Sequence, residues 1–576
     1  MKNFLIGLVA GIVLAGLTLL IFVFAAVRFA GSFAERPVSV ADGSTIVLKL
    51  EGSVPEKSPP EIPLPFFQEQ TPMTVEEVWQ TFRKAAADAR VKGILFEPRG
   101  LDIGWAKMQE MREEIAQFKK SGKPVVTYLQ NPSAREYYLA TATDRIYIAP
   151  EDELDLKGLR VESIFLKGTL DKVGVKFDVI HAGKYKDAGD ILTQTSMSAE
   201  TREVLNQILD QYYGNLTDTV AQGRKQQPDA VQAAIDQGPY VAKDALAKGL
   251  VDALGYEDQA VEDMKGRLKQ ADLKRVASKA YLRAQVPASG TTRRIALIVG
   301  EGEISQGSGN ESPTDTGFTA TAFIRLLKQV ENDTSIKGVI LRVDSPGGDG
   351  VASDNILHEV KNLSKKKPLV ISMSDLAASG GYYVAASGDP IIAYPNTLTG
   401  SIGVIFARAN LHGLFDKIGL NEQLLTRGHY ADIDSPYVPL SDDARQKITG
   451  EIDAFYRAFV SRVAEGRKKS FDQIEPLAQG RVWLGAQAKQ NGLVDELGGL
   501  DRAVELIRKR ANIGANENIT LVPYPGKRSV FDLLFNRSDD SGELDLRVEK
   551  LLGQLPIRSL GKGGFLKLMP YSIRVR

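Results

Sequence analysis

Short apolar runs alternate along the chain with longer stretches of mixed polarity, and this alternation predicts an α/β fold. The apolar runs Thr45–Leu50, Gly93–Phe96 and Val125–Tyr128 are typical of strands, because each is only four to six residues long. The stretches Val75–Asp88 and Met108–Lys120, which lie between these runs, favour helices. Strands that alternate with helices in this way predict an α/β core.

The same order of segments returns about 245 residues later, which indicates an internal repeat. Four pairs of matching segments carry this signal: Val91–Leu95 with Ile336–Ile340, Tyr137-Tyr138 with Tyr382-Tyr383, Asp171–Gly174 with Asp416–Gly419, all at an offset of 245, and Lys248–Asp252 with Asn491–Asp495 at 243. We therefore predict two copies of one fold. The expected boundaries are a first repeat over residues 43–265, a linker over 266–293, a second repeat over 294–511, and an extension of unknown role over 512–576.

The amino-terminal segment is the strongest candidate for a membrane contact. Residues 4–27 contain no charged side chain, and these 24 residues would span about 36 Å as a helix, against roughly 30 Å for a hydrocarbon core. We predict a transmembrane anchor within residues 1–30. A cleaved signal peptide is the alternative, because small residues follow Phe24 and Phe29. In both cases we expect the remainder of the chain outside the cytoplasm.

Composition narrows the chemistry further. The 576 residues carry 72 basic and 72 acidic side chains, and this balance gives no indication of a nucleic-acid partner. The chain has no cysteine, which excludes a thiol nucleophile, disulfides and thiolate metal sites. It has only four histidines, and no nucleotide fingerprint or carboxylate cluster stands out, so we predict neither a metal nor a cofactor.

The two copies differ reciprocally at positions that bear reactive groups. At the offset of 245, Ser379 in the second copy corresponds to Ala134 in the first, whereas Lys186 in the first copy corresponds to Ala431 in the second. A serine hydroxyl needs a base to become a nucleophile, and a lysine whose pKa is lowered by burial can serve as that base. Each copy therefore holds one half of a possible Ser/Lys pair.

Further residues fit acyl transfer around this pair. Ser379 follows an apolar run, Pro368–Met373, and precedes two glycines, a pattern that suits a nucleophile at a strand-to-helix turn. The amides of Gly347 and Gly380 are the predicted donors to an oxyanion. Lys184 is the alternative base: in an extended segment it would share a face with Lys186, and each lysine would then depress the other's pKa. His429, which corresponds to Lys184, is a reserve candidate.

These motifs resemble those of the signal peptide peptidase A (protease IV) family, in its long form with two tandem copies. The resemblance runs from the amino-terminal anchor to about residue 511 and rests on four segments besides the anchor: Asp344–Gly348, Ala377–Tyr382, Thr397–Gly403, and Tyr185-Lys186 upstream of Met197-Ser198. It implies two crotonase-like (Clp-protease-like) repeats, with Ser379 as nucleophile and Lys186 as general base. It also implies a homotetramer at the bacterial inner membrane, with a single span and a periplasmic catalytic part that cleaves remnant signal peptides.

Three functions therefore remain open at this stage. The first is a membrane-anchored serine endopeptidase that acts on signal peptides and unfolded apolar peptides. The second is a crotonase-type enzyme acting on acyl-CoA, which needs the oxyanion glycines but no serine nucleophile. The third is a non-catalytic membrane scaffold, against which the reciprocal pattern argues, because decay has no reason to spare complementary halves.

Overall fold

The computed structural model describes residues 16–18, 21, 39–59, 71–286, 291–307, 317–526 and 565–569 of the chain. The predicted anchor at residues 4–27 lies almost entirely outside these ranges. Within them, no helix combines the length and the apolar character needed to cross a bilayer.

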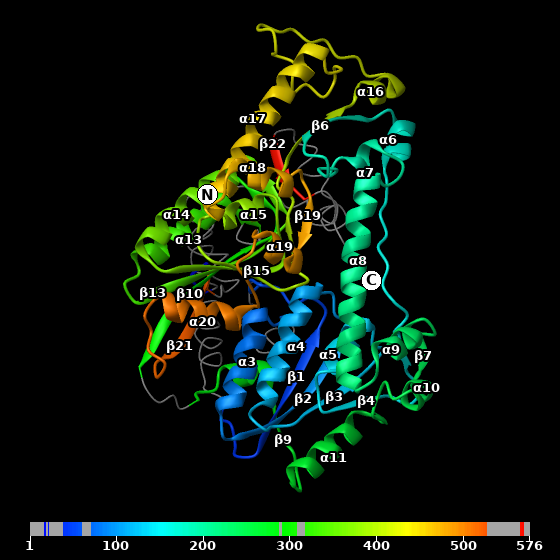
Figure 1. Ribbon diagram of the computed structural model, residues 1–576, viewed down its shortest axis with the longest axis vertical. Helices are drawn as coiled ribbons and strands as arrows, with labels where there is room; N and C mark the ends of the chain where they lie inside the picture. The colour runs from blue at the N-terminus through cyan, green and yellow to red at the C-terminus, as the bar shows by residue number, and fades with distance from the viewer. Residues whose placement is uncertain are drawn as a thin grey trace, which may run out of the picture.

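The first repeat is built on a parallel sheet in the order β8-β4-β3-β2-β1-β9 (Figure 1). Its strands are β1 (Ser44–Glu51), β2 (Val91–Arg99), β3 (Val125–Leu129), β4 (Arg145–Ile148), β8 (Ala253–Leu254) and β9 (Lys274–Ala277), and a small separate pair is formed by β5 (Glu153–Leu154) and β7 (Tyr240–Val241). Its helices are α3 (Val75–Ala87), α4 (Trp105–Lys119), α5 (Ala134–Ala140), α6 (Lys167–Val173), α7 (Asp190–Thr193), α8 (Ala199–Arg224), α9 (Pro228–Ile235), α10 (Ala242–Ala247), α11 (Glu257–Leu268) and α12 (Ser278–Leu282). All five elements that the apolar pattern predicts in this repeat are present.

The second repeat has a corresponding sheet in the order β19-β17-β15-β13-β10-β21, with β16 paired to β15 and β20 paired to β16. Its strands are β10 (Thr292–Glu301), β13 (Ile336–Ser345), β15 (Leu369–Ala378), β16 (Ile391–Ala393), β17 (Leu398–Gly400), β19 (Val482–Leu484), β20 (Glu496–Leu497) and β21 (Asn518–Tyr524). Its helices are α13 (Ala320–Asn332), α14 (Gly350–Lys366), α15 (Gly380–Ala385), α16 (His412–Ile418), α17 (Asp442–Arg467), α18 (Phe471–Ile474), α19 (Gly485–Asn491) and α20 (Leu500–Arg510), with a 3₁₀ turn η1 (Glu475–Leu477).

The long helices α8 and α17 show how closely the repeats agree. Each has 26 residues, begins after a serine that caps its first turn (Ser198 and Ser441), and ends at a lysine in the left-handed region (Lys225 and Lys468). Serine oxygens at this position satisfy amides that have no acceptor within the helix, so the same local chemistry fixes both starts. The duplication therefore extends to the capping residues.

Two predicted boundaries need correction. The segment expected as a linker, 266–293, contains β9 and α12, and β9 pairs in parallel with β1 at the edge of the first sheet. Likewise, part of the expected extension, 512–576, is β21, which pairs in parallel with β10 at the matching edge of the second sheet. Lys274 and Ile519 are 245 positions apart, so each repeat ends one strand later than the sequence predicted.

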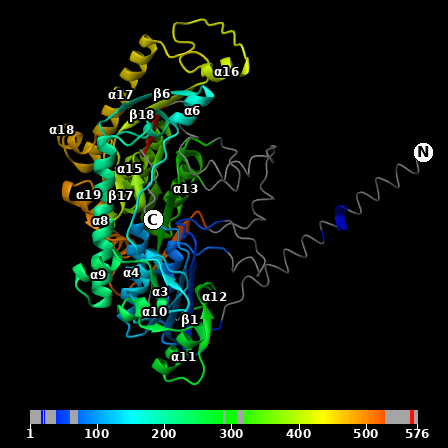
Figure 2. The same ribbon diagram turned by 90° about the vertical axis from the view of Figure 1, so that its right-hand side faces the viewer.

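A third sheet connects the repeats, and we call it the inter-repeat sheet. Its order is β12-β11-β14-β22-β18-β6, formed by β12 (Phe318–Thr319), β11 (Ile304–Ser305), β14 (Gly347–Asp349), β22 (Phe565–Leu568), β18 (Val404–Asn410) and β6 (Lys176–Ala182). Strand β6, from the first repeat, pairs antiparallel with β18 of the second over seven residues. Figure 2 shows β6, β18 and α6 grouped beneath α16 at one end of the molecule.

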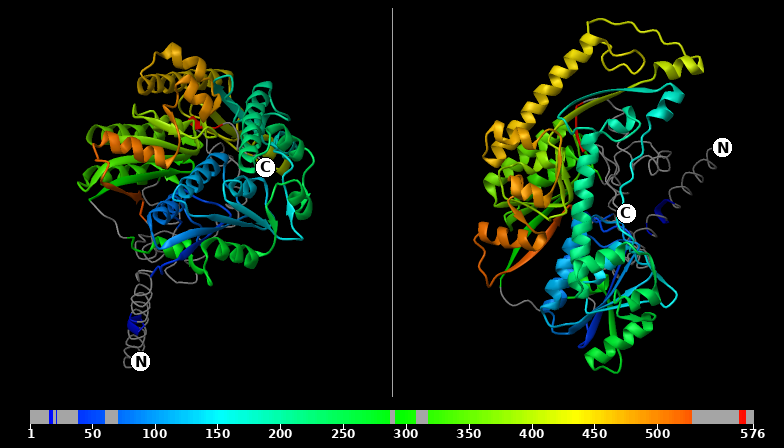
Figure 3. Two further views of the ribbon diagram at one scale, coloured as in Figure 1. Left: turned by 60° about the horizontal axis from the view of Figure 1, so that its bottom comes forward. Right: turned by 45° about the vertical axis from the view of Figure 1, so that its right-hand side comes forward.

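The repeats also share one hydrophobic core. Residues such as Met111 and Phe118 of α4 belong to the same buried cluster as Val370 of β15 and Leu500 of α20. Both views in Figure 3 place the blue helices of the first repeat directly against the second. Because burial of such side chains is the main stabilising contribution to folding, the two repeats form one body.

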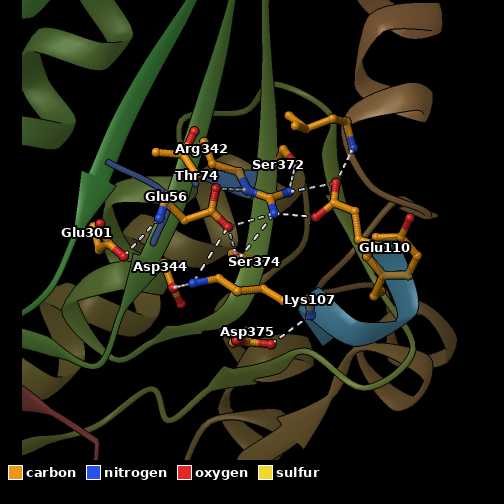
Figure 4. A network of polar contacts seen from close by, with 12 residues as sticks. Glu56, Thr74, Lys107, Glu110, Glu301, Arg342, Asp344, Ser372, Ser374 and Asp375 are labelled. Atoms are coloured by element: carbon orange, nitrogen blue, oxygen red, sulfur yellow. Dashed lines mark hydrogen bonds and ion pairs between the residues drawn. The ribbon is translucent and has the colours of Figure 1, made fainter. Parts of the chain in front are cut away.

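A buried ion network lies within this shared core, and Figure 4 shows its members converging from both repeats. It consists of Glu56, Lys107 and Glu110 from the first repeat and Glu301, Arg342, Asp344 and Asp375 from the second, with Ser372 and Ser374. The Arg342 guanidinium, which is fully buried, donates to both Glu56 and Glu110. Lys107 pairs with Asp344 at 2.7 Å. The network therefore joins α4 to the ends of β13 and β15.

Candidate active site

Ser379 lies where β15 ends and α15 begins, in a strained backbone conformation. Its φ is +54° and its ψ −115°, a combination that a residue with a Cβ rarely adopts. Two hydrogen bonds hold the turn: the Ser379 amide donates to the Gly400 carbonyl at 2.8 Å, and the Ser379 carbonyl accepts from the Tyr383 amide at 2.8 Å. The predicted strand-to-helix turn is therefore present, and its serine side chain is fully buried.

Lys186 from the first repeat reaches this serine. The Lys186 Nζ lies 2.8 Å from the Ser379 Oγ, 2.9 Å from the Ser401 carbonyl oxygen and 3.0 Å from the Ser401 Oγ. A neutral amine has two N–H donors and one lone pair, so it can donate to both Ser401 oxygens and accept the Ser379 hydroxyl proton. A charged ammonium could instead donate to all three oxygens, so the contacts alone fit either protonation state.

Burial favours the uncharged state. The Lys186 side chain is completely inaccessible to solvent. Burial lowers the pKa of its amine well below the usual value, because the charged form loses its hydration, and the neighbouring Asp187 carboxylate partly opposes this shift. Burial also raises the pKa of Asp187 to about 7, so near neutrality its opposing charge is incomplete.

Lys184 does not share this environment, and the predicted mutual effect of two lysines is wrong. Residues 183–185 form a turn closed by the Lys186 amide donating to the Gly183 carbonyl at 3.1 Å, so the segment is not extended. The Lys184 side chain is 61% exposed and pairs with Glu200 at 3.5 Å. Of the two lysines, only Lys186 contacts Ser379.

Two glycines leave the space that Lys186 needs to lie close to Ser379, and the sequence had not indicated a role for either of them. A Cβ on Gly480, whose φ is +75°, would lie 2.6 Å from both the amide nitrogen and the Cβ of Lys186. A Cβ on Gly403 would lie 3.0 Å from the Lys186 Cδ. Ser401, which orients the amine, was likewise missed, although it stands in the Thr397–Gly403 motif.

The predicted oxyanion donors lie close together beside Ser379. Gly347 has a φ of +97°, and a Cβ on it would lie 2.5 Å from the Gly380 amide nitrogen. Gly380 opens α15, so its amide has no acceptor within the helix. The Gly347 amide donates to the Ser345 Oγ at 3.2 Å. The Gly348 amide nitrogen lies 3.2 Å from where a Cβ on Gly380 would stand, which makes Gly348 a third candidate. The assignment of Gly347 and Gly380 remains a prediction.

The matching place in the first repeat is blocked by the protein itself. Where the second repeat has Ser379 and Gly381, the first has Ala134 and Glu136. The Glu136 carboxylate accepts from the Leu101 amide at 2.5 Å and from the Ser133 amide at 2.8 Å. A cavity of about 650 Å³ remains beside these residues. The first repeat thus has a cavity at this place, but the Leu101 amide beside it already donates to the Glu136 carboxylate.

The histidines lie elsewhere. His429, the reserve base, is an exposed residue that pairs with Asp443 at 2.6 Å. His181 and His358 are also exposed. In the part of the chain that the structure describes, no group of three or more histidine, aspartate or glutamate side chains is arranged to hold a metal ion.

Comparisons with known proteins identify the family to which the chain belongs. The family model described as peptidase family S49 matches residues 117–272 and 361–514, one segment in each repeat. The chain is 35% identical to serine protease SPPA, chloroplastic, of Arabidopsis thaliana, over 92% of this chain and 79% of that protein. It is 33% identical to protease 4 of Haemophilus influenzae, over 75% of this chain and 72% of that protein, and 32% identical to protease 4 of Salmonella typhi, over 80% and 75%.

One solved structure, a ClpP1 mutant from Listeria monocytogenes, is 18% identical and covers 35% of this chain and 91% of its own, with a TM-score of 0.22. The sequence comparisons confirm the family that the motifs predicted and support the peptidase hypothesis over the acyl-CoA and scaffold hypotheses. The chain belongs to peptidase family S49 and is a serine peptidase.

Proposed function

We propose that this chain is a membrane-anchored endopeptidase in which Ser379 is the nucleophile and Lys186 the general base. Its substrates are remnant signal peptides and other unstructured apolar peptides. The observation that carries this proposal is the 2.8 Å contact between the Lys186 Nζ and the Ser379 Oγ, both of which are buried.

The contacts support a defined sequence of proton transfers. The neutral Lys186 amine, held by its two bonds to Ser401, accepts the proton of the Ser379 hydroxyl while the oxygen attacks the substrate carbonyl. The resulting oxyanion is stabilised by amides of the Gly347-Gly348 turn and of Gly380. The Lys186 ammonium then gives its proton to the leaving amine, which departs and leaves an ester on Ser379. A water molecule hydrolyses this ester by the same steps, with Lys186 again acting as base.

We further propose that residues 4–27 anchor the chain as a single span in the bacterial inner membrane, with the catalytic part on the periplasmic side. The support is the uncharged length of that segment, which exceeds the thickness of a hydrocarbon core. We also propose that the two repeats are crotonase-like. The support is the run of parallel strands that their sheets have in common and the glycine turns after β13 and β15.

A homotetramer is part of this proposal, and the duplication supports it. Within one chain, β6 and Lys186 of the first repeat pack on the second. The corresponding segment of the second repeat, residues 411–439, is largely exposed, with Leu425 at 93%. Its expected acceptor, residues 159–165 of the first repeat, forms no described strand and leaves Ile164 73% exposed. A second copy would cover both surfaces in a head-to-tail contact, and such contacts form a ring when the rotation between copies closes.

Three alanine variants test the dyad. Purified full-length protein should cleave an unstructured apolar peptide that carries a fluorophore and a quencher. Ser379→Ala and Lys186→Ala should each abolish this cleavage, whereas Lys184→Ala, an exposed lysine two positions away, should retain most of it. Full activity of Ser379→Ala would refute the dyad.

Native mass spectrometry of the protein in detergent tests the tetramer, and Leu425→Glu should dissociate it.

A further inference from the structure

The segment Phe565–Met569 lies in the position of a bound peptide. Strand β22 fills a gap one strand wide between β14 and β18 in the inter-repeat sheet. It pairs antiparallel with both neighbours: Gly348 lies opposite Lys567, and Ile405 lies opposite Leu566. Without this strand, β14 and β18 would each present an unpaired edge beside the Gly347-Gly348 turn, and we call the space between these edges the groove. An extended peptide that adds a strand between two sheet edges is a common mode of peptide recognition.

Buried side chains hold the segment in place. Leu566 is 6% exposed, Lys567 3% and Met569 5%. Leu566 packs in a cluster with Ile405 and Ala188, close to the base Lys186. The Met569 amide donates to the Pro346 carbonyl at 2.9 Å. These contacts come from side chains on both walls of the groove and from its backbone.

The register of this strand relates it to the reacting atoms. A Cβ built on Gly347 would lie 2.0 Å from the Lys567 carbonyl oxygen and 2.5 Å from the Gly380 amide nitrogen. The Lys567 carbonyl therefore lies beside the predicted oxyanion amides. In a substrate held the same way, that carbonyl belongs to the residue before the scissile bond.

The side chain of Lys567 enters a pocket built from the second repeat. Its Nζ lies 3.3 Å from the centre of the Tyr383 ring and 5.2 Å from that of Phe459. It also lies 3.3 Å from the Gly350 carbonyl oxygen. Burial lowers the pKa of the Lys567 amine to about 7, and the carboxylate of Asp354, which accepts from the Tyr383 hydroxyl, partly opposes this shift. Long hydrocarbon stems suit such a pocket because its aromatic rings exclude water, and these rings also attract the amine when it is charged.

From these contacts we infer that residues 565–569 act as an internal competitor for the substrate groove, with Lys567 in the subsite that precedes the scissile bond. That subsite selects long unbranched side chains and favours lysine. The inference depends on the proposed function for the identity of the groove. It adds a regulatory segment and a substrate preference that the dyad itself does not require.

A binding measurement tests the inference without relying on catalysis. The protein is full-length Ser379→Ala, and the probe is a labelled peptide of sequence Phe-Leu-Lys-Leu-Met with blocked ends, followed by fluorescence anisotropy. A tethered segment acts at an effective concentration on the order of 1 mM, so a free peptide with a Kd of about 0.1 mM would bind roughly tenfold more weakly while the groove is occupied. Adding Lys567→Glu should lower the measured Kd about tenfold, because Asp354 and the buried pocket would expel a carboxylate.

The matched control is Lys365→Glu, the same charge change at an exposed position of α14, which should leave the Kd unchanged. An equal Kd in both variants would overturn the inference. A Kd shift that grows with protein concentration would also overturn it, because the competing segment would then belong to a second copy.

The side-chain preference is tested on the Ser379→Ala/Lys567→Glu protein. Peptides with lysine or norleucine at the third position should bind at least about tenfold more tightly than one with glutamate. Equal binding of all three would refute the assigned subsite. Loss of cleavage in Ser379→Ala tests the dyad separately, so failure of one proposal leaves the other standing.

Discussion

Replacing Arg342 with methionine should expose how much the buried ion network contributes to stability. The Arg342 side chain is fully buried and donates to Glu56 at 2.9 and 3.0 Å, to Glu110, and to the Ser372 Oγ at 2.9 Å. Methionine conserves much of the side-chain length but leaves two buried carboxylates without their main cation. Lys107, at 3.9 Å from Glu56, is the remaining partner. Removal of one member of a buried ion pair costs roughly 3–5 kcal/mol.

The loss of stability caused by Arg342→Met should depend on pH. In the intact protein, burial would raise the pKa of Glu56, but Arg342 and Lys107 more than offset this and lower it. Burial and the charge of Glu56 raise the pKa of Glu110. A carboxyl with a lowered pKa stabilises the fold above its unfolded pKa, and this contribution is lost as the pH falls through the folded value. Without Arg342, both carboxyls would bind protons more tightly in the folded state. The difference in stability between the unchanged protein and the Arg342→Met variant should therefore be largest near pH 8 and shrink towards pH 5.

Thermal unfolding followed by circular dichroism provides the assay. The entropy of unfolding is about 2.1 cal/mol/K per residue, or roughly 1 kcal/mol/K for the roughly 480 residues of the two joined repeats, so we expect a decrease in Tm of roughly 3–5 °C at pH 8. Arg502→Met is the matched control, because Arg502 also bridges two glutamates, Glu496 and Glu505, but its side chain is 33% exposed. Such an exposed pair contributes at most about 1 kcal/mol. Equal Tm losses in the two variants, or a loss independent of pH, would refute the reasoning.

Three further predictions concern the base. Asp187→Asn removes the carboxylate that opposes the lowered pKa of Lys186, so the acidic limb of the kcat/KM profile should move to lower pH; an unchanged profile would contradict this. Gly480→Ala places a Cβ 2.6 Å from the Lys186 backbone and should reduce kcat/KM at least about 100-fold. The control is Gly492→Ala, which is also at positive φ but faces only the end of the Lys469 side chain. This control variant should lose some stability and keep its activity. Lys186→Met should raise the Tm at pH 7. A lysine whose pKa is lowered in the folded protein destabilises it increasingly as the pH falls below the pKa of the unfolded chain, near 10.4. The gain in Tm should therefore vanish towards pH 10, and a gain that is constant with pH would count against burial as the cause.

The strands and the repeat were predictable because they depend on local patterns. The apolar runs at Thr45–Leu50 and Val125–Tyr128 became β1 and β3 almost residue for residue. The offset of 245 correctly related the two sheets. The last strand of each repeat was missed, since β9 and β21 are short or only partly buried, and they are recognisable as strands through their pairing with β1 and β10.

The contact between Ser379 and Lys186 could be predicted from the sequence, because each of these residues is missing from the other repeat. Their catalytic roles stay a prediction, and the residues around them could not be predicted. The sequence alone could not exclude Lys184 as the base. The two lysine side chains point in different directions because residues 183–185 form a turn, and this turn is apparent only in the structure. Ser401, Gly403 and Gly480 contact Lys186 through folding of distant segments, and no spacing rule relates their positions to it. The same holds for β22, whose partners lie more than 150 residues earlier in the sequence.

The separation of Ser379 from Lys186 by 193 positions has a consequence for how the protein is made. A ribosome adding about 5–20 residues per second needs roughly 10–40 s to pass from the lysine to the serine, and longer to complete β18, which aligns β6 beside it. Under the proposed mechanism, the nascent chain carries a base without a nucleophile throughout that interval, and the two groups meet only when both repeats are complete and joined. We therefore expect a fragment that retains either repeat alone, whether from interrupted synthesis or from later degradation, to lack peptidase activity.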